Sequence, residues 1–353
     1  MNPEPPPLPV ANEPTLSPDF QSKVFQRINR YNRRKQTTLN LLLFCSVVAV
    51  SFVVRRQNPR QEIEVAQGGR AESAAKGVTW LVNSQDHEGN WKSENWGGQS
   101  TFNDGISALA TLALLNAPDP VPRDIMDKAI TSLESSLSRQ QTLPEQGPEF
   151  YNRILTLYAL LEVQKQMPDP QRKRLLEESL ARLLRSQQAD GGWGYAARQP
   201  MGYTDSPDAN SAVTWWICHL LEDNPTLNVP GAEYAVEHGK NWLAARLNST
   251  GHIAYQSEDG HIAGPDDALY WMSALLYPTM STAKVETQDA YRDYFRLAAS
   301  PDNRSFEQLQ QQQQPSGEWQ NSRDRWWRAG GKVYLTALSV LSQVPKERPG
   351  ESG

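Results

Sequence analysis

The stretch WLVNSQDHEGNW spans residues 80–91 and contains a pattern that returns three more times along the chain. In this first copy Leu81 is followed by Gln85, Gly89 and Trp91, at steps of four, four and two residues. The later copies keep these steps, with the third copy degenerate: Leu183, Gln187, Gly191 and Trp193; Leu243, Leu247, Gly251 and Ile253; Leu309, Gln313, Gly317 and Trp319. Recurrence at fixed steps indicates structural repeats. The sequence therefore predicts repeated units before any single residue suggests a chemistry.

Helical periodicity dominates the chain after residue 70, and alternating strand patterns are scarce. Five segments are apolar on nearly every side: 107–115, 154–163, 211–221, 268–276 and 333–341. They alternate with five amphipathic segments: 74–84, 125–139, 172–187, 234–247 and 306–313. A helix that is apolar all round is enclosed by protein, whereas an amphipathic helix keeps one wet face. The alternation predicts an inner and an outer layer of helices.

The spacing of the repeats indicates one hidden unit. The glycines at 89, 191, 251 and 317 are separated by 102, 60 and 66 residues, so the first gap is close to two units long. Leu137, Gln141 and Gly147 resemble the remnant of a further copy inside that gap. We therefore expect about five helix pairs, each built from about 50 residues.

The pattern resembles the QW motif of the squalene/hopene cyclase and protein-prenyltransferase superfamily. The first copy matches it in full from Lys76-Gly77 to Trp91, and the DGGWG at 190–194 is equally typical. The resemblance covers residues 74–341. It implies an all-α fold, an α/α toroid in which inner helices line a central cavity and outer helices face solvent. The family's full ring has one more pair than the five expected here.

The motif residues have a structural interpretation. Glycine permits backbone angles that other residues avoid, which suits the turn after an outer helix. Tryptophan buries a large ring while its N–H finds an acceptor, and the glutamine amide can donate to exposed carbonyl groups. We expect no direct catalytic role for these residues.

Carboxylates are the candidates for catalysis. Cyclases of the family that protonate their substrate use an Asp-x-Asp-Asp signature, which this chain lacks. The nearest approaches are Asp205 with Asp208, and Asp266 with Asp267, each just before an apolar helix. A carboxylate at that place also caps the helix by accepting from free N–H groups, as Asp104 is expected to do. Capping is the favoured interpretation, and it would still bring the carboxylates to one rim of the cavity.

Aromatic and basic side chains supply two further candidate sites. Trp215, Trp216, Tyr270 and Trp271 lie on apolar segments and are expected to line the cavity, where aromatic rings stabilise cations. In the last repeat, basic residues surround Trp326-Trp327, and no Asp is expected before its apolar helix. The candidates for binding an anion there are Arg325, Arg328 and Lys332. A solvated loop is the simpler alternative.

Composition gives no reason to expect a metal, a cofactor or a nucleic acid. The net charge is −5, and the part of the chain after residue 70 has no long basic run. Prenyltransferases of the superfamily bind zinc through Asp, Cys and His, but Cys218-His219 is the only such pair in that part. Adjacent residues on a helix point about 100° apart, so they make a poor shared site. Cys218 is expected to be a core residue.

The first 70 residues differ from the rest. Residues 1–18 are rich in proline and predict a disordered tail. Residues 19–36 predict a basic amphipathic helix suited to anionic lipid headgroups, with a solvated basic linker as the alternative. Residues 37–54 carry no charge and are long enough to cross a bilayer as a helix. A cleaved signal peptide is the competing interpretation, although no cleavage-site pattern follows the segment.

The remaining boundaries follow from these segments. Residues 55–70 are a predicted linker, 71–344 the repeat domain and 345–353 a polar tail. Six Lys or Arg precede the predicted span between residues 23 and 35, and three follow it by residue 60. Because cytoplasmic flanks carry more Lys and Arg, we expect a cytoplasmic N-terminus and an extracytoplasmic ring.

Three functions are compatible with the sequence. The first is a single-pass membrane protein whose toroid binds a lipid, an apolar ligand or a partner protein, without standard cyclase chemistry. The alternative is a terpene-cyclase-like or prenyltransferase-like enzyme acting on an isoprenoid substrate through the Asp pairs. A third is a membrane-bound regulator that passes a signal inward through its N-terminal segment.

Overall fold

The computed structural model describes residues 67–140, 147–194, 209–248, 252–255, 262–263, 267–276, 289–299 and 303–344. The chain divides into two compact units, Met1–Glu62 and Ile63–Gly353, and all of the described residues belong to the second. The segments expected over residues 1–54 and the tail over 345–353 lie outside the described residues. None of the described helices is both long enough and apolar enough to cross a membrane.

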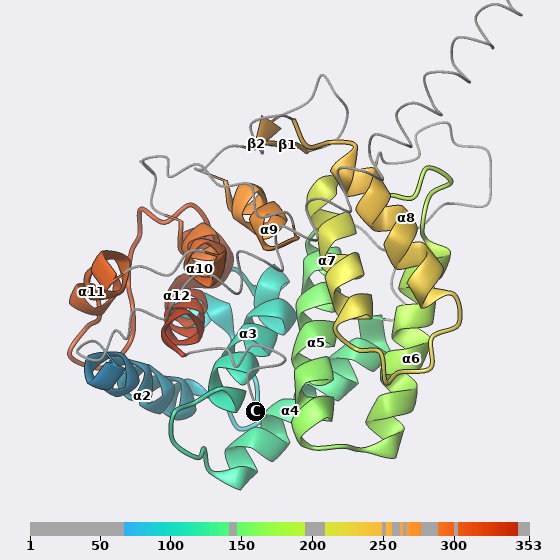
Figure 1. Ribbon diagram of the computed structural model, residues 1–353. Helices are drawn as coiled ribbons and strands as arrows, with labels where there is room; N and C mark the ends of the chain where they lie inside the picture. Colours follow the sequence, from blue (N-terminus) through green and yellow to red (C-terminus); the bar gives the residue numbers. More distant parts are fainter. Residues whose placement is uncertain are drawn as a thin grey trace, which may run out of the picture. The chain divides into compact units, whose positions relative to one another are not determined.

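The second unit is helical in two layers (Figure 1). The outer helices are α2 (Gln67–Ser84), α4 (Arg123–Gln140), α6 (Pro170–Arg185), α8 (Ala232–Ala244) and α11 (Asn303–Gln311). The inner helices are α3 (Asn103–Leu115), α5 (Gly147–Gln166), α7 (Ser211–Glu222), α9 (Ala268–Leu276), α10 (Ala290–Ala299) and α12 (Trp327–Gln343). Two 3₁₀ turns, η1 (Ser93–Trp96) and η2 (Ser100–Phe102), precede α3. Strands β1 (Ile253–Ala254) and β2 (Ile262–Ala263) form a short antiparallel pair, with Ile253 opposite Ala263.

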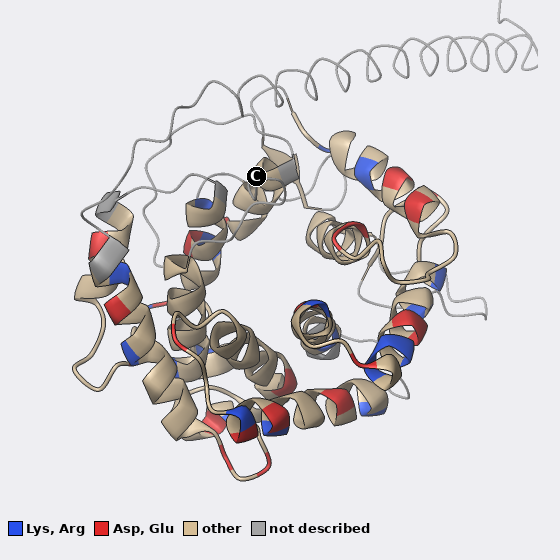
Figure 2. Cartoon of the chain, turned by 60° about the horizontal axis from the view of Figure 1, so that its bottom comes forward, with Lys and Arg blue, Asp and Glu red and all other residues tan. Residues whose placement is uncertain are grey.

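Residue composition explains which layer each helix joins. Inner helix α3 buries ten consecutive residues from Gly105 to Leu114, whereas outer helix α6 keeps charged residues on its solvent face. Charged positions accordingly lie mostly on the outer helices (Figure 2). Helix α6 begins where Asp169 accepts from the N–H groups of Gln171 and Arg172, with Pro170 in its first turn. Local capping and amphipathicity together set this helix.

The inner helices form a closed ring. Each packs against the next in the order α3, α5, α7, α9, α10 and α12, and α12 packs against both α3 and α2. The expected ring of helix pairs is confirmed, and the pair α4/α5 occupies the long gap between the first two copies. Helix α10 was not expected: it is a sixth inner helix in the described part, and no described outer helix immediately precedes it. Gly147 begins α5 instead of forming a turn.

In three copies the motif tryptophan binds its own unit. The indole N–H of Trp91 donates to the Leu81 carbonyl at 2.8 Å, and Trp193 and Trp319 do the same to Leu183 and Leu309, at 2.9 and 2.7 Å. The backbone N–H of each tryptophan donates to a hydroxyl on the following inner helix: Ser107, Thr214 and Thr336. These hydroxyls belong to the repeat although the sequence pattern does not reveal them. The tryptophan thereby ties the outer helix of its unit to the inner one.

The motif glutamine connects neighbouring units. Gln187 donates from Nε2 to the carbonyl of Gly191 and to that of Ala235 on the next outer helix, both at 2.8 Å. The equivalent amide of Gln85 reaches Ile125 on α4, and that of Gln313 reaches Ser73 on α2. The last contact joins the final repeat to the first. It closes the ring with the same side chain that joins successive units elsewhere.

The degenerate copy retains the backbone turn but not the glutamine. The N–H of Asn248 donates to the His252 carbonyl, as Gln314 does to Glu318 in the last copy. Leu247 stands in the glutamine position, and Ile253 in the tryptophan position is fully buried. This copy follows outer helix α8. In the described part of the chain, the two inner helices α9 and α10 come next, before outer helix α11.

Replacing Gln187 with leucine is expected to destabilise the ring by about 2–3 kcal/mol, because two carbonyl groups lose their donor in a partly buried place. Urea unfolding of the full chain in detergent micelles measures the change. The control is Gln312→Leu, since Gln312 is exposed and lies outside the motif. If the two substitutions destabilised the chain equally, the motif glutamine would not be what joins neighbouring units.

Candidate functional site

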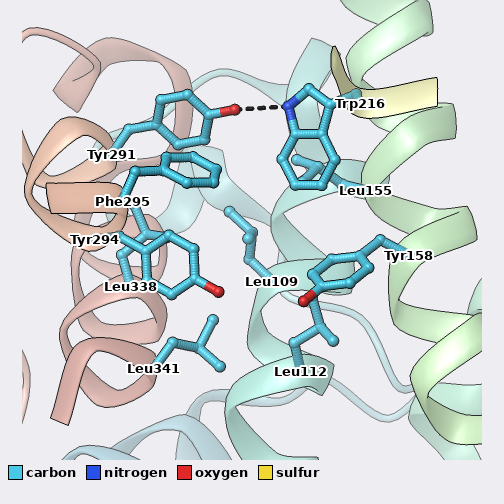
Figure 3. Close-up of a pocket in the computed structure, with 10 residues that line it drawn as sticks. All are labelled: Leu109, Leu112, Leu155, Tyr158, Trp216, Tyr291, Tyr294, Phe295, Leu338 and Leu341. Atoms are coloured by element: carbon cyan, nitrogen blue, oxygen red, sulfur yellow. Dashed lines mark hydrogen bonds between the residues drawn. The ribbon is translucent and has the colours of Figure 1, made fainter. Parts of the chain in front are cut away.

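The centre of the ring is filled by apolar side chains. Side chains from α3, α5, α7, α10 and α12 point toward one another at the centre (Figure 3). The cavity that remains between them has a volume of about 10 Å³. A cavity of that size holds about one water molecule. The lining residues are Leu109, Leu112, Leu155, Tyr158, Trp216, Tyr291, Tyr294, Phe295, Leu338 and Leu341. Between these described side chains, the remaining cavity is too small for an isoprenoid chain.

Aromatic rings from α7 and α10 form one wall of this centre. The indole N–H of Trp216 donates to the Tyr291 hydroxyl at 2.8 Å (Figure 3). The Phe295 ring stands edge-on to the rings of Trp215 and Tyr291, with centroids 5.5 and 5.0 Å away. Edge-to-face contacts of this kind are favourable between aromatic rings. Helix α10 thus supplies the side chains that close the centre from one side.

The four expected cavity aromatics separate into two groups. Trp216 lines the central cavity, and Trp215 is buried beside it with ring centroids 5.2 Å apart. Tyr270 and Trp271 are buried on α9 and contact each other, but neither lines this cavity.

The acidic candidates are only partly described. Asp205, Asp208 and Asp266 lie outside the described residues. Asp267 caps α9, because its Oδ1 accepts from the Leu269 N–H at 3.0 Å. Asp104, which was expected to cap a helix, instead lies within the first turn of α3, whose N-cap is Phe102, and accepts from Arg139 and Gln140 of α4. Both described carboxylates therefore have structural contacts.

The anion-binding candidates have three different environments. Lys332 pairs with Glu318 at 3.0 Å, Arg325 lies 3.9 Å from Asp267, and Arg328 is exposed. The Arg325 guanidinium also faces the Trp326 ring at 5.3 Å. The expectation that no Asp precedes the last apolar helix was wrong, since Asp324 lies three residues before α12 begins at Trp327.

Two buried carboxylates converge on the N-terminus of α10. Oδ1 of Asp289 accepts from the Arg292 N–H at 2.9 Å. Asp324 bridges two segments, because its Oδ2 accepts from the Ala290 N–H at 2.7 Å and its Oδ1 from the Trp326 N–H at 2.8 Å. The two residues are only 2% and 6% exposed. This acid pair was missed because α10 itself was not expected.

Burial dominates the electrostatics of the acid pair. It raises the pKa of Asp324 to about 6, against the N–H donors of Ala290 and Trp326, and the nearby Asp289 carboxylate raises it further. Burial likewise raises the pKa of Asp289, against the hydrogen bond from the Arg292 N–H and the charges of Arg292 and Arg325. Burial together with both carboxylates holds the pKa of Tyr334 well above its usual range.

Metal-binding side chains do not gather in the described part of the chain. No group of three or more His, Cys, Asp or Glu residues there is arranged to hold a metal ion. Cys218 is fully buried, and this burial raises the pKa of its thiol to about 12. The thiol is therefore protonated and packed in the core.

Comparison with known proteins identifies the fold and no closer relationship. No protein-family model and no curated protein sequence matches the chain. An alpha-1,6-mannanase from Salegentibacter sp. matches with a TM-score of 0.53 at 12% identity, over 78% of this chain and 98% of its own. A cellobiose 2-epimerase from Spirochaeta thermophila matches with a TM-score of 0.52 at 14% identity, over 81% and 98%.

The chain has the α/α toroid fold. A type II terpene cyclase from Scytonema also matches, at 16% identity over 79% of this chain and 97% of its own. Its TM-score is only 0.38, so the similarity of the two structures is weak. The mannanase and the epimerase catalyse different reactions although both are structurally similar to this ring of helices. The fold therefore does not select a reaction, and function must be argued from the site.

Proposed function

We propose that the chain is a membrane-anchored binding module whose helical ring docks a partner protein and performs no cyclase-type chemistry. The filled centre carries this proposal. Cyclase chemistry needs a chamber that encloses an isoprenoid chain, and the lining side chains leave about 10 Å³. The anchor in this proposal is the uncharged segment 37–54.

A rim loop over residues 321–328 is the docking surface in this proposal. Trp326 is 45% exposed, and the side chains of Arg323, Arg325 and Arg328 are exposed beside it. Tryptophan and arginine are enriched among the residues that dominate binding energy at protein interfaces. Because the one acid of the loop, Asp324, is buried, the exposed surface is cationic. It therefore suits a partner with an acidic face.

The catalytic part of the proposal is tested by turnover. The full chain in detergent micelles is incubated with squalene and, separately, with geranylgeranyl diphosphate, and products are sought by mass spectrometry. We expect no product and no thermal stabilisation by either compound. Product formation that Asp267→Asn or Asp324→Asn abolishes would replace the binding module by an enzyme.

The docking part is tested by site-specific crosslinking. A photoreactive amino acid placed at Trp326 in the full chain, in its native membrane, is expected to capture a discrete partner. The matched control places it at Tyr234 of α8, which is 64% exposed and outside the loop. The crosslink should weaken at least about tenfold when Arg325 and Arg328 become glutamate, since charge reversal opposes an acidic face. A crosslink of equal yield at Tyr234, or one that survives charge reversal, would contradict the docking surface.

One observation favours the alternative, an enzyme that protonates an isoprenoid substrate. Burial raises the pKa of Asp324 to about 6, so this carboxyl can hold a proton near neutral pH. Tyr334, whose pKa responds to that carboxylate, lies one turn along α12 from the cavity-lining Leu338. This alternative requires the centre to open, and the turnover experiment above decides between the two.

A further inference from the structure

We propose that Asp289 and Asp324 form a proton-dependent latch that holds α10 in the ring and releases it when the shared site loses its proton. The inference concerns how the ring opens and does not depend on the partner proposed above.

The first argument is the geometry of the α10 N-terminus. Asp289 directly precedes α10 and caps it by accepting from the Arg292 N–H. Asp324, in the segment that leads into α12, accepts from the Ala290 N–H at the start of α10. Asp324 thus links the start of α10 to the segment that leads into the neighbouring inner helix. A change at this carboxylate acts directly on the attachment of α10.

The second argument is that a buried polar atom at this place lacks a partner. Oδ2 of Asp289 is buried and has no hydrogen-bond partner among the described residues. Tyr334 of α12, which is 5% exposed, faces both carboxylates of the pair. A buried carboxylate oxygen without a donor is costly when ionised. A proton on the acid pair removes one of two like charges.

The charged groups around the pair do not remove this cost. On α10, Arg292 and Asp293 face the pair, and the Arg292 side chain binds Asp293 at 2.8 Å. From the rim loop, Arg325 faces Asp289 and also lies near Asp267 of α9. From α12, Tyr334 faces both carboxylates. Each arginine is shared with a further acid, so the pair keeps a raised affinity for a proton.

The direction of the pH effect follows from the Asp324 pKa. It rises from an ordinary value of 3.8 to about 6 when α10 is docked. The docked state therefore binds the proton more tightly than the released state. The contribution to docking is fully present below pH 3.8 and is lost as the pH rises through about 6. The latch holds in mild acid and loosens at neutral pH.

Release of α10 has a consequence for the centre. Tyr291, Tyr294 and Phe295 of α10 form one wall of the cavity in Figure 3. The release of α10 uncovers the aromatic face of Trp216 and enlarges the centre. The ring then has a closed form and an open form that differ in the position of one helix.

Hydrogen exchange of the full chain in detergent micelles tests the latch. Protection of the α10 amides, corrected for intrinsic exchange, is compared at about pH 5 and about pH 7.5, on either side of the Asp324 pKa. We expect α10 to lose about tenfold of its protection at the higher pH, because pH 5 lies about one unit below the Asp324 pKa of about 6 and above the ordinary value of 3.8. Peptides from α7 in the same sample serve as the internal reference.

The matched variants are Asp289→Asn and Asp169→Asn. Asparagine at 289 retains an acceptor for the Arg292 N–H and places an uncharged amide at the partnerless oxygen, so it mimics the protonated pair. We expect a smaller loss of α10 protection at the higher pH in this variant than in the wild type, because Asp324 stays buried and ionisable but no longer faces a second carboxylate. Asp169 caps outer helix α6, and its pKa is lowered by the Arg172 N–H, so Asp169→Asn should behave as the wild type at α10.

Two results would overturn the latch. One is equal protection of α10 at both pH values in the wild type, and the other is an unchanged pH dependence in Asp289→Asn. If that variant does not fold, the wild-type comparison of α10 with α7 decides alone.

Discussion

Replacing Gly317 with alanine is expected to destabilise the ring by about 3–4 kcal/mol, the largest effect of any single methyl group that we predict. Gly317 has a φ of +103°, in the region that side chains rarely adopt. A Cβ added there would overlap the carbonyl oxygen of Lys76 on α2. Because that oxygen belongs to a helix backbone, it cannot turn aside as a flexible side chain would. The substitution therefore pushes the last repeat away from the first.

A second glycine separates the backbone strain at positive φ from the steric overlap with α2. Gly231 has a φ of +85°, but nothing lies within 4 Å of an added Cβ. Gly231→Ala therefore incurs only the backbone strain, about 1–2 kcal/mol. The difference between the variants in urea unfolding measures the closing contact between α2 and the last motif. Equal destabilisation would show that Gly317 serves only its own turn and that the ring does not depend on this contact.

Exchange measurements give a second view of the same variant. If Gly317→Ala opens the ring at the contact between first and last repeats, the amides of α2 should lose protection before those of α6, which lies between other units. A uniform loss across both helices would indicate that the ring unfolds as a whole and has no weak point at its closure.

The sequence predicted the ring because the ring is built from local rules. The motif glycine, glutamine and tryptophan act within one turn and its neighbour, and their contacts repeat wherever the residues recur. Periodicity alone distinguished inner from outer helices, because burial on all sides leaves no polar face. Asp267 was correctly expected to cap a helix, since capping needs only the residues that follow.

Helix α10 was missed for a physical reason. It follows no motif copy, and its ten residues form a strongly amphipathic segment that reads as an outer helix or a loop connection. Only the closure of the ring turns its aromatic face inward beside Trp216. The available signal for the start of this helix was Asp289, two residues before Tyr291 and upstream of the aromatic pair Tyr294-Phe295.

The candidate site could not be predicted for a related reason. The high pKa of Asp324 arises from burial and from Asp289, 35 residues earlier in the chain. Neither property has a local sequence signature. The filling of the centre is likewise a sum of side-chain volumes from five helices, and no motif reports it. The residues that match the family pattern therefore predicted the ring of helices. They did not predict how its centre is filled.

Replacing Trp193 with alanine is the second large effect, with an expected loss of about 3–5 kcal/mol. Trp193 is fully buried, and its indole N–H binds the Leu183 carbonyl at 2.9 Å. Its ring lies against α8 so closely that a Cβ at Gly239 would be 2.6 Å from Cζ3. Alanine leaves a cavity between two outer helices that neither helix can fill, because Gly239 has no side chain.

Two further variants identify which property of the tryptophan matters. Trp193→Phe keeps most of the buried volume and loses the indole hydrogen bond, so about 1–2 kcal/mol is expected. Trp326→Ala removes a tryptophan that is 45% exposed in the rim loop, so a change within about 0.5 kcal/mol is expected. Urea unfolding ranks all three in one experiment. If Trp193→Ala lowered the free energy of unfolding no more than Trp326→Ala does, the packing of Trp193 would not stabilise the contact between neighbouring units.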